Sequence, residues 1–128
     1  MPEPLFHLFA GGPRPVAPYS HAVEVDGWIF LTGQLPIDNE GTVPETIEKQ
    51  TEMTFANLQF VLEKCGASLA NVVCVRVYLT NFEAHYERMN KVYSGIFPSG
   101  RYPARTCIGV SQLARGCHIE IDMVARRP

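Results

Sequence analysis

The chain has 128 residues, of which 46% are hydrophobic and 19% are charged, and its formal net charge at pH 7 is −2. This length and composition predict one globular domain over residues 1–128 and exclude a disordered chain. The weak negative charge argues against a nucleic-acid partner, and no apolar run approaches the ~20 residues of a membrane span.

Residues 1–12, MPEPLFHLFAGG, begin without a basic segment and contain no long apolar segment. We therefore expect no signal peptide and a cytoplasmic location. The sequence has four cysteines without a C-x-x-C pair, for which we expect reduced thiols: Cys65, Cys74, Cys107 and Cys117. The four histidines show no zinc-ligand spacing, and we expect no metal site.

The first half of the chain predicts three strands and a long helix. Residues 5–9 are a short candidate edge strand, and a loop rich in glycine and proline follows. Residues 21–25 and 28–34 flank Asp26 and Gly27, and such a pair between alternating apolar residues is a strong signal for a two-residue hairpin turn. From Glu45 to Cys65 the apolar period becomes helical, with Gly66 at the position of a helix-ending glycine. One stripe of side chains defines this helix: Ile47, Thr51, Phe55, Leu58, Leu62 and Cys65.

The second half predicts a strand, a helix and two further strands. Thr80 and Glu83 have the spacing of a capping box, which predicts a helix that begins near Phe82 and continues to Phe97. Strands over 104–110 and 117–125 complete the order β-β-β-α-β-α-β-β. The strand over 71–80, NVVCVRVYLT, carries apolar residues on both faces: Val73, Val75, Val77 and Leu79 on one, and Val72, Cys74 and Tyr78 on the other.

Two helices can cover only one face of such a sheet. The fold class is therefore α+β, with a mixed sheet whose second face stays exposed in a single chain. Apolar side chains on that second face usually mark an interface. We expect a homo-oligomer whose sheets meet between subunits.

The strand over 104–110 begins with an arginine, which is unusual for a core strand. Arg105, Cys107 and Gly109 share one of its faces, while apolar and β-branched residues occupy the other. A guanidinium fork can bind a carboxylate through two hydrogen bonds in one plane. The small neighbours on the same face would leave a shallow slot for an anionic ligand.

Two alternatives remain open for this arginine. In the first, Arg105 forms an ordinary ion pair with Glu120 or Asp122 on a neighbouring strand. In the second, Arg101 is the carboxylate binder, although its place in a turn after Gly100 favours a solvated side chain.

Several stretches of the chain together resemble one known family: APYSHAV at 17–23, LTGQLP at 31–36, MNKVYSGIFP at 89–98, and YPARTCIGV at 102–110 followed by IEID at 119–122. They are similar to the motifs of the reactive intermediate deaminase family (the Rid, formerly YjgF, proteins), from about residue 14 to the C-terminus. The resemblance implies a chorismate-mutase-like fold and a homotrimer with three sites at its subunit interfaces. It also implies hydrolysis of 2-imino acids, such as 2-iminopropanoate and 2-iminobutanoate, and of their enamine tautomers to 2-oxo acids and ammonia without a cofactor.

The resemblance assigns a role to individual residues. Arg105 matches the arginine that holds the substrate carboxylate, and Cys107 and Glu120 match residues that line the same pocket. Tyr19 matches the residue that closes the pocket across the subunit interface. We expect Glu120 to orient the attacking water, and Cys107 to be a wall of the pocket, because no activating base for a thiolate is evident. Further lining positions are Thr32, Gly33 and Asn90.

The sequence also departs from the family pattern. Thr32 stands where many members carry serine, and Ala17 replaces the glycine usual before the Pro-Tyr pair. These differences bear on substrate size and leave open a pathway-specific enamine deaminase of the same fold. A third alternative is a non-catalytic trimer that binds 2-oxo acids or acts as a chaperone. A nuclease ranks last, because the sequence shows neither a basic patch nor a catalytic histidine pair.

Overall fold

The structure, a computed structural model, describes residues 3–128. Met1 and Pro2, the first residues of the segment for which no signal peptide is expected, lie outside the described residues. The strands form one six-stranded sheet in the order β1-β2-β3-β6-β4-β5. The elements are β1 (Leu5–His7), β2 (Ala22–Val25), β3 (Trp28–Gln34), α1 (Ile47–Lys64), β4 (Val72–Leu79), α2 (Phe82–Tyr93), β5 (Ala104–Gly109) and β6 (Ile119–Arg126), with short 3-10 turns at Leu69–Asn71 and Ala114–Gly116.

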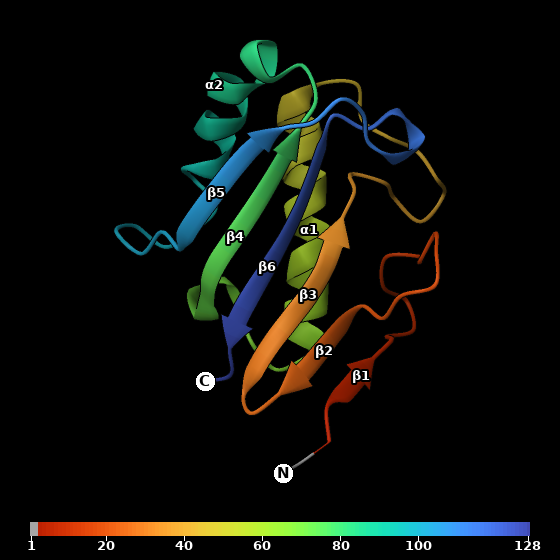
Figure 1. Cartoon of the computed structure of the whole chain (residues 1–128), viewed down its shortest axis with the longest axis vertical. Coiled ribbons are helices and arrows are strands. Elements are labelled where there is room, and N and C mark those ends of the chain that lie inside the picture. Colours follow the sequence, from red (N-terminus) through yellow and green to blue (C-terminus); the bar gives the residue numbers. More distant parts are fainter. Residues whose placement is uncertain (1–2) are drawn as a thin grey trace.

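The sheet is mixed, as the sequence predicts. Strands β4 and β5 run parallel, and every other neighbouring pair is antiparallel. Both helices lie on one side of the sheet, α1 behind its central strands and α2 near the edge formed by β5 (Figure 1). The predicted order of elements and the α+β class are therefore confirmed, and we call the two sides of the sheet the helix side and the open side.

The hairpin between β2 and β3 forms at the predicted dipeptide. Asp26 and Gly27 have φ angles of 51° and 82°, and Val25 lies opposite Trp28. Positive φ at both central residues is the property of the turn that matches the twist of two antiparallel strands.

Helix α1 follows the predicted apolar stripe. It begins at Ile47, two residues later than expected, because the Thr46 hydroxyl caps it by accepting the Lys49 N–H at 3.2 Å. Gly66 follows its end with a φ of 80°, as predicted. All six stripe residues are buried, and the helix packs on β3 and β6.

The predicted capping box of α2 is wrong. Its N-cap is Asn81, in the left-handed region with φ 47°, and no side chain caps the helix. The Thr80 hydroxyl instead shares a 2.6 Å hydrogen bond with His118 Nδ1, so it cannot reach the helix N–H groups. The helix ends at Tyr93, and Phe97 is buried in the turn that follows.

The strict alternation expected for β4 fails at its start. A register shift between Val72 and Cys74 buries Val72 and leaves Val73 41% exposed, so Val73 does not share a face with Val75. Such a bulge inserts one residue into the strand, so the side chains before it lie on the faces opposite to those that strict alternation predicts.

The open side of the sheet carries the exposed apolar area that the sequence predicts. Trp28, Phe30, Val73 and Ile108 are 41–47% exposed there. Strand pairing also aligns one cross-strand row on this side: Phe6, Val23, Phe30, Val124 and Cys74. All four cysteines are free thiols. Over residues 3–128, no helix is long and apolar enough to cross a bilayer.

Candidate functional site

Arg105 lies on the helix side of the sheet, beneath α2. Its strand partner is Val75, which is fully buried in the core. One guanidinium nitrogen donates to Asn90 Oδ1 at 2.7 Å, and the other donates to the Tyr86 hydroxyl at 3.3 Å. The guanidinium carbon also lies 4.7 Å from the centre of the Tyr93 ring. This half-buried cation is therefore fixed in position by polar and aromatic groups of α2.

No carboxylate neutralises Arg105 within residues 3–128. Asp122 bonds to Arg76 at 2.8 Å and to the Tyr78 hydroxyl at 3.0 Å on the open side. The alternative in which Arg105 pairs with Glu120 or Asp122 is therefore wrong for the single chain. An arginine held in place without a counter-charge is suited to bind an anion.

A recess of about 320 Å³ surrounds Arg105, and we call it the arginine recess. Its lining residues are Asn90, Tyr93, Ser94, Tyr102, Pro103 and Arg105. The Tyr93 hydroxyl is buried and has no hydrogen-bond partner among residues 3–128, and burial raises its pKa to about 12. A buried hydroxyl that keeps its proton and lacks an acceptor is an exception to the rule that buried polar groups are hydrogen-bonded.

Cys107 shares the face of Arg105, as the sequence predicts, but is not among the lining residues of the recess. Burial raises the pKa of its thiol, and the positive charge of Arg105 opposes that effect only in part. The raised pKa keeps this side chain a neutral thiol near neutral pH, which argues against a nucleophile, and its role as a pocket wall stays a prediction.

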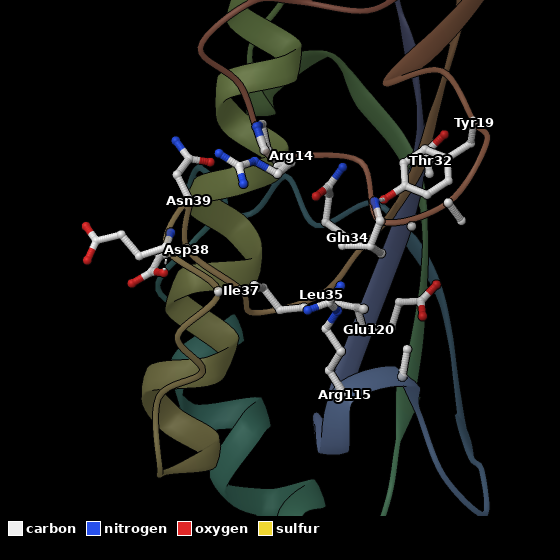
Figure 2. Close-up of a pocket in the computed structure, with 17 residues that line it drawn as sticks. Arg14, Tyr19, Thr32, Gln34, Leu35, Ile37, Asp38, Asn39, Arg115 and Glu120 are labelled. Carbon is white, nitrogen blue, oxygen red and sulfur yellow. Dashed lines mark hydrogen bonds between the residues drawn. The ribbon is translucent and has the colours of Figure 1, made fainter.

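A larger cavity lies beside the open side, and we call it the glutamate cavity. It measures about 480 Å³, and Tyr19, Thr32, Gly33 and Glu120 all line it (Figure 2). The Thr32 hydroxyl donates to the Ser20 carbonyl at 2.5 Å, which ties the end of β3 to the loop that carries Tyr19. Four of the predicted site residues are thereby brought together.

Glu120 is the half-buried acid of this cavity. Its carboxylate forms no ion pair among residues 3–128. Burial raises its pKa, and the negative charge of Asp122 raises it further. Gly33 makes room for this group, because a Cβ on Gly33 would overlap Glu120 Oε2 and lie 3.1 Å from Cδ.

The two groups of residues do not meet within one chain. Arg105, Cys107 and Asn90 belong to the helix side, whereas Glu120 pairs with Tyr78 on the open side. The expectation that Cys107 and Glu120 line one pocket is therefore not met within a single subunit.

Sequence reasoning named Asn90 but missed Tyr93, which lines the arginine recess, and Tyr86, which bonds to Arg105. Tyr86, Asn90 and Tyr93 follow one face of α2 at positions i, i+4 and i+7, a spacing that could have linked both tyrosines to Asn90. The glutamate cavity also includes Arg14, Gln34, Asp38, Asn39 and Arg115, and all except Gln34 lie in irregular segments that offer no periodic signal.

Two histidines also come together, which their spacing in the sequence did not predict. The rings of His85 and His118 have centroids 4.8 Å apart. His85 Nδ1 bonds to the Thr80 carbonyl at 2.7 Å, and His118 Nδ1 bonds to the Thr80 hydroxyl. Neither ring lines the arginine recess or the glutamate cavity, and through Thr80 the two rings connect the first turn of α2 to the residue before β6. No cluster of three or more metal-ligating side chains occurs in the described part of the chain.

Comparison with known proteins supports the fold and its family. The family model described as Endoribonuclease L-PSP matches residues 10–127. A RutC family protein of Pyrococcus abyssi is 41% identical over 115 residues, which cover 88% of this chain and 89% of that protein. The crystal structure of a yeast protein matches with a TM-score of 0.92 and 31% identity, over 98% of this chain and 100% of that one. A Yersinia pestis structure described as a conserved Rid family protein of unknown function matches with a TM-score of 0.90 and 29% identity, over 97% and 99% of the two chains.

The six-stranded sheet with two helices on one side is the fold of the Rid proteins. The chain belongs to the Endoribonuclease L-PSP family, and the membership of the Rid group predicted from its sequence motifs is confirmed.

Proposed function

We propose that this protein hydrolyses reactive 2-imino acids and their enamine tautomers to 2-oxo acids and ammonia. Membership of the Rid family supports an imine or enamine deaminase in general. Within that class we propose 2-iminopropanoate and 2-iminobutanoate as substrates, and a cytoplasmic location. The net charge of −2 gives no field that attracts a polyanion, so the nuclease named in the family description is not carried over to this chain.

The observation that carries the proposal is the state of Arg105. Its guanidinium is held by Asn90 and Tyr86, lines a recess, and lacks a carboxylate partner among residues 3–128. A 2-imino acid supplies the missing carboxylate.

The proposed site is completed by a second copy of the chain. The arginine recess of one subunit would face the glutamate cavity of its neighbour, which brings a cation and an acid to the two ends of one ligand. Because these surfaces differ, the contact is head-to-tail, and such contacts form a ring when the rotation between copies closes. The family resemblance favours a ring of three, and the exposed apolar open side offers the area to bury between sheets.

The proposed hydrolysis depends on how the two subunits position the substrate and a water molecule. Arg105 fixes the substrate carboxylate so that the C=N carbon faces a water molecule. Glu120 of the neighbouring copy accepts a proton from that water while the water oxygen forms a bond to the C=N carbon. The C–N bond then breaks with transfer of protons to nitrogen, so that one imine and one water give one 2-oxo acid and one ammonia. Tyr19, Thr32 and Gly33 shape the cavity around this step.

The first test is hydrolysis of 2-aminoacrylate generated in place by a serine dehydratase, with semicarbazide to trap the remaining imine. Wild-type protein should accelerate pyruvate release, and Arg105→Ala should lose about a hundredfold or more of this effect, because the carboxylate anchor is gone. Arg101→Ala is the matched control, since Arg101 is exposed and does not line the recess. Absence of acceleration by the wild-type protein with imines of several sizes would refute the proposal. Light scattering tests the assembly separately, and we expect the mass of a trimer.

A further inference from the structure

Tyr86 bonds to the arginine of the proposed site but does not line the recess around it. The Tyr86 hydroxyl accepts a hydrogen bond from one terminal guanidinium nitrogen of Arg105 at 3.3 Å. The other terminal nitrogen donates to Asn90 Oδ1 at 2.7 Å. Asn90 is among the lining residues of the arginine recess, whereas Tyr86 is not. An effect of Tyr86 on a ligand in the recess therefore passes through Arg105.

Two acceptors fix the guanidinium of Arg105 more completely than one would. The group is planar, and each of its terminal nitrogens carries two N–H donors. A single hydrogen bond would leave the plane free to pivot about the bonded nitrogen, whereas acceptors at both terminal nitrogens hold the plane. Tyr86 and Asn90 lie one turn apart on α2 and supply these two acceptors. The second N–H of each terminal nitrogen can then bind the two oxygens of a carboxylate.

Phe82 holds the ring of Tyr86 in place. The two rings stack, with centroids 4.7 Å apart and an angle of 20° between their planes. Phe82 is the first residue of α2, one turn before Tyr86, and both side chains pack against the hydrophobic core. Since α2 begins without a side-chain cap, this stack also stabilises the first turn of the helix.

Gly109 makes room for Phe82 on β5. A Cβ on Gly109 would lie 3.3 Å from Phe82 Cβ and 3.5 Å from its Cδ2, so a larger residue would displace the ring. The sequence suggests that the small residues beside Arg105 leave space for a ligand, but at Gly109 an aromatic ring of the protein fills that space. The close approach completes a series of contacts from Gly109 through Phe82 and Tyr86 to Arg105.

We propose that Tyr86 is a positioning residue, which orients the Arg105 guanidinium for the substrate carboxylate. The inference rests on the proposed function, in which Arg105 holds that carboxylate. Tyr86 takes no part in the proton transfers of the reaction. Because the carboxylate is held both before and during the reaction, loss of the Tyr86 hydroxyl weakens binding and raises KM, while kcat stays close to its native value.

Tyr86→Phe tests this role, because it removes the hydroxyl and keeps the ring that stacks on Phe82. The substrate is 2-iminobutanoate, generated from 2-aminobutanoate by a flavin-dependent amino-acid oxidase, and calorimetric titration gives the Kd of the product 2-oxobutanoate. We expect KM and this Kd to rise about three- to tenfold, as for the loss of one hydrogen bond, and kcat to stay within about twofold. Arg88→Gln is the control: it removes two hydrogen bonds of 2.8 Å to Glu48 from the outer surface of the same helix and should change neither KM nor Kd.

A double-mutant cycle separates positioning from a general effect on the helix. Arg105→Lys keeps a positive charge but replaces the planar fork with a single ammonium group, whose orientation Tyr86 cannot set. In this background, Tyr86→Phe should change the Kd of 2-oxobutanoate by less than about twofold. An equal loss of affinity in both backgrounds would overturn the inference, because Tyr86 would then act on the fold.

Failure of the inference and failure of the proposed function give different results. If Tyr86→Phe keeps the native KM and Kd, the inference fails and the deaminase remains. A loss confined to kcat would assign Tyr86 to the chemical step and also overturn the inference. If the wild-type protein hydrolyses no imine, the proposed function fails, and the Kd of 2-oxobutanoate alone decides about Tyr86. A rise in Kd that depends on Arg105 would then sustain its positioning role, whereas an unchanged Kd, or no binding by the wild-type protein, would end it.

Discussion

Arg105 and Glu120 lie on opposite faces of one sheet, although only β4 separates their strands. Arg105 pairs with Val75 on the helix side, and Glu120 pairs with Tyr78 on the open side. Each chain therefore carries both halves of the proposed site and cannot bring them together by itself. Activity should follow from how subunits combine rather than from each chain alone.

Mixed assemblies test this arrangement directly. Arg105→Ala and Glu120→Gln should each abolish activity in pure assemblies, but mixed assemblies should recover part of it. With random mixing, about one quarter of the sites receive a native Arg105 from one chain and a native Glu120 from its neighbour. The measurement is kcat of assemblies purified through two different affinity tags. Mixed assemblies that form but stay as inactive as the pure ones would contradict a shared site.

Gly33→Ala should separate activity from stability. Its Cβ would overlap the Glu120 carboxylate, which is the flexible end of a side chain and can move away. Gly33 does not have a positive φ, so the backbone accepts alanine. We expect kcat/KM to fall about tenfold or more, because a displaced acid no longer orients water, and the free energy of unfolding to change by less than about 1 kcal/mol.

Gly95→Ala is the control for this substitution. A Cβ there would lie 3.7 Å from the Val92 carbonyl oxygen, which is ordinary contact, and activity and stability should both be retained. Loss of stability by Gly33→Ala as large as its loss of activity would show that Gly33 serves the fold instead of the acid.

Local signals in the sequence predict most of the fold. The Asp26-Gly27 turn and the stripe of α1 depend on residues within a few positions of each other, and both are confirmed. The wrong capping box has a distant cause, because the Thr80 hydroxyl is taken by His118, 38 positions away. The bulge after Val72 likewise depends on how β4 pairs with β6.

The candidate site could be predicted only in part, for the same reason. Alternation correctly placed Arg105 and Cys107 on one face of their strand. The face of Arg105 and the side chain of Glu120 could lie on the same side of the sheet or on opposite sides. The register of β4 with β5 and with β6 decides between the two, and no local pattern in the sequence encodes a register. Arg14 and Arg115 belong to loops brought together by the whole fold, and no periodicity marks them.

The C-terminus should contribute to stability through one ion pair. Arg127 donates to both carboxylate oxygens of Glu24, at 2.5 and 2.8 Å, and to the Cys65 carbonyl at 2.6 Å. The hydrogen bonds from Arg127 lower the pKa of Glu24, against the opposite effect of burial. Arg127→Ala should lower the free energy of unfolding by about 1–2 kcal/mol at pH 7, a modest value because Arg127 is 41% exposed.

The pH dependence of that loss identifies its origin. A carboxyl with a lowered pKa in the folded state stabilises the fold above its unfolded pKa, and the contribution disappears as pH falls through the lowered value. Urea unfolding of wild type and Arg127→Ala should therefore differ less in strong acid than at pH 7, and the bond to the Cys65 carbonyl accounts for the difference that remains. A difference that persists unchanged in acid would assign the whole loss to the Cys65 carbonyl bond and to packing of the Arg127 stem, and none of it to the ion pair.

Glu120 should set the acid limit of activity. Burial and the charge of Asp122 raise its pKa, so the carboxyl keeps its proton to a higher pH than an ordinary glutamate with a pKa of 4.5. Because only the ionised form can accept a proton from water, kcat/KM should fall as pH drops through this raised value. The acid limb should disappear in Glu120→Gln, along with most of the activity.

Asp122→Asn tests the cause of that limit. Removing the negative charge beside Glu120 lowers the pKa of Glu120. The acid limb of the pH profile should therefore move to lower pH, with the rate on the plateau little changed. Arg88→Gln, outside the cavity, should leave the limb in place. A limb that stays fixed in Asp122→Asn would mean that another group than Glu120 titrates in the rate-determining step.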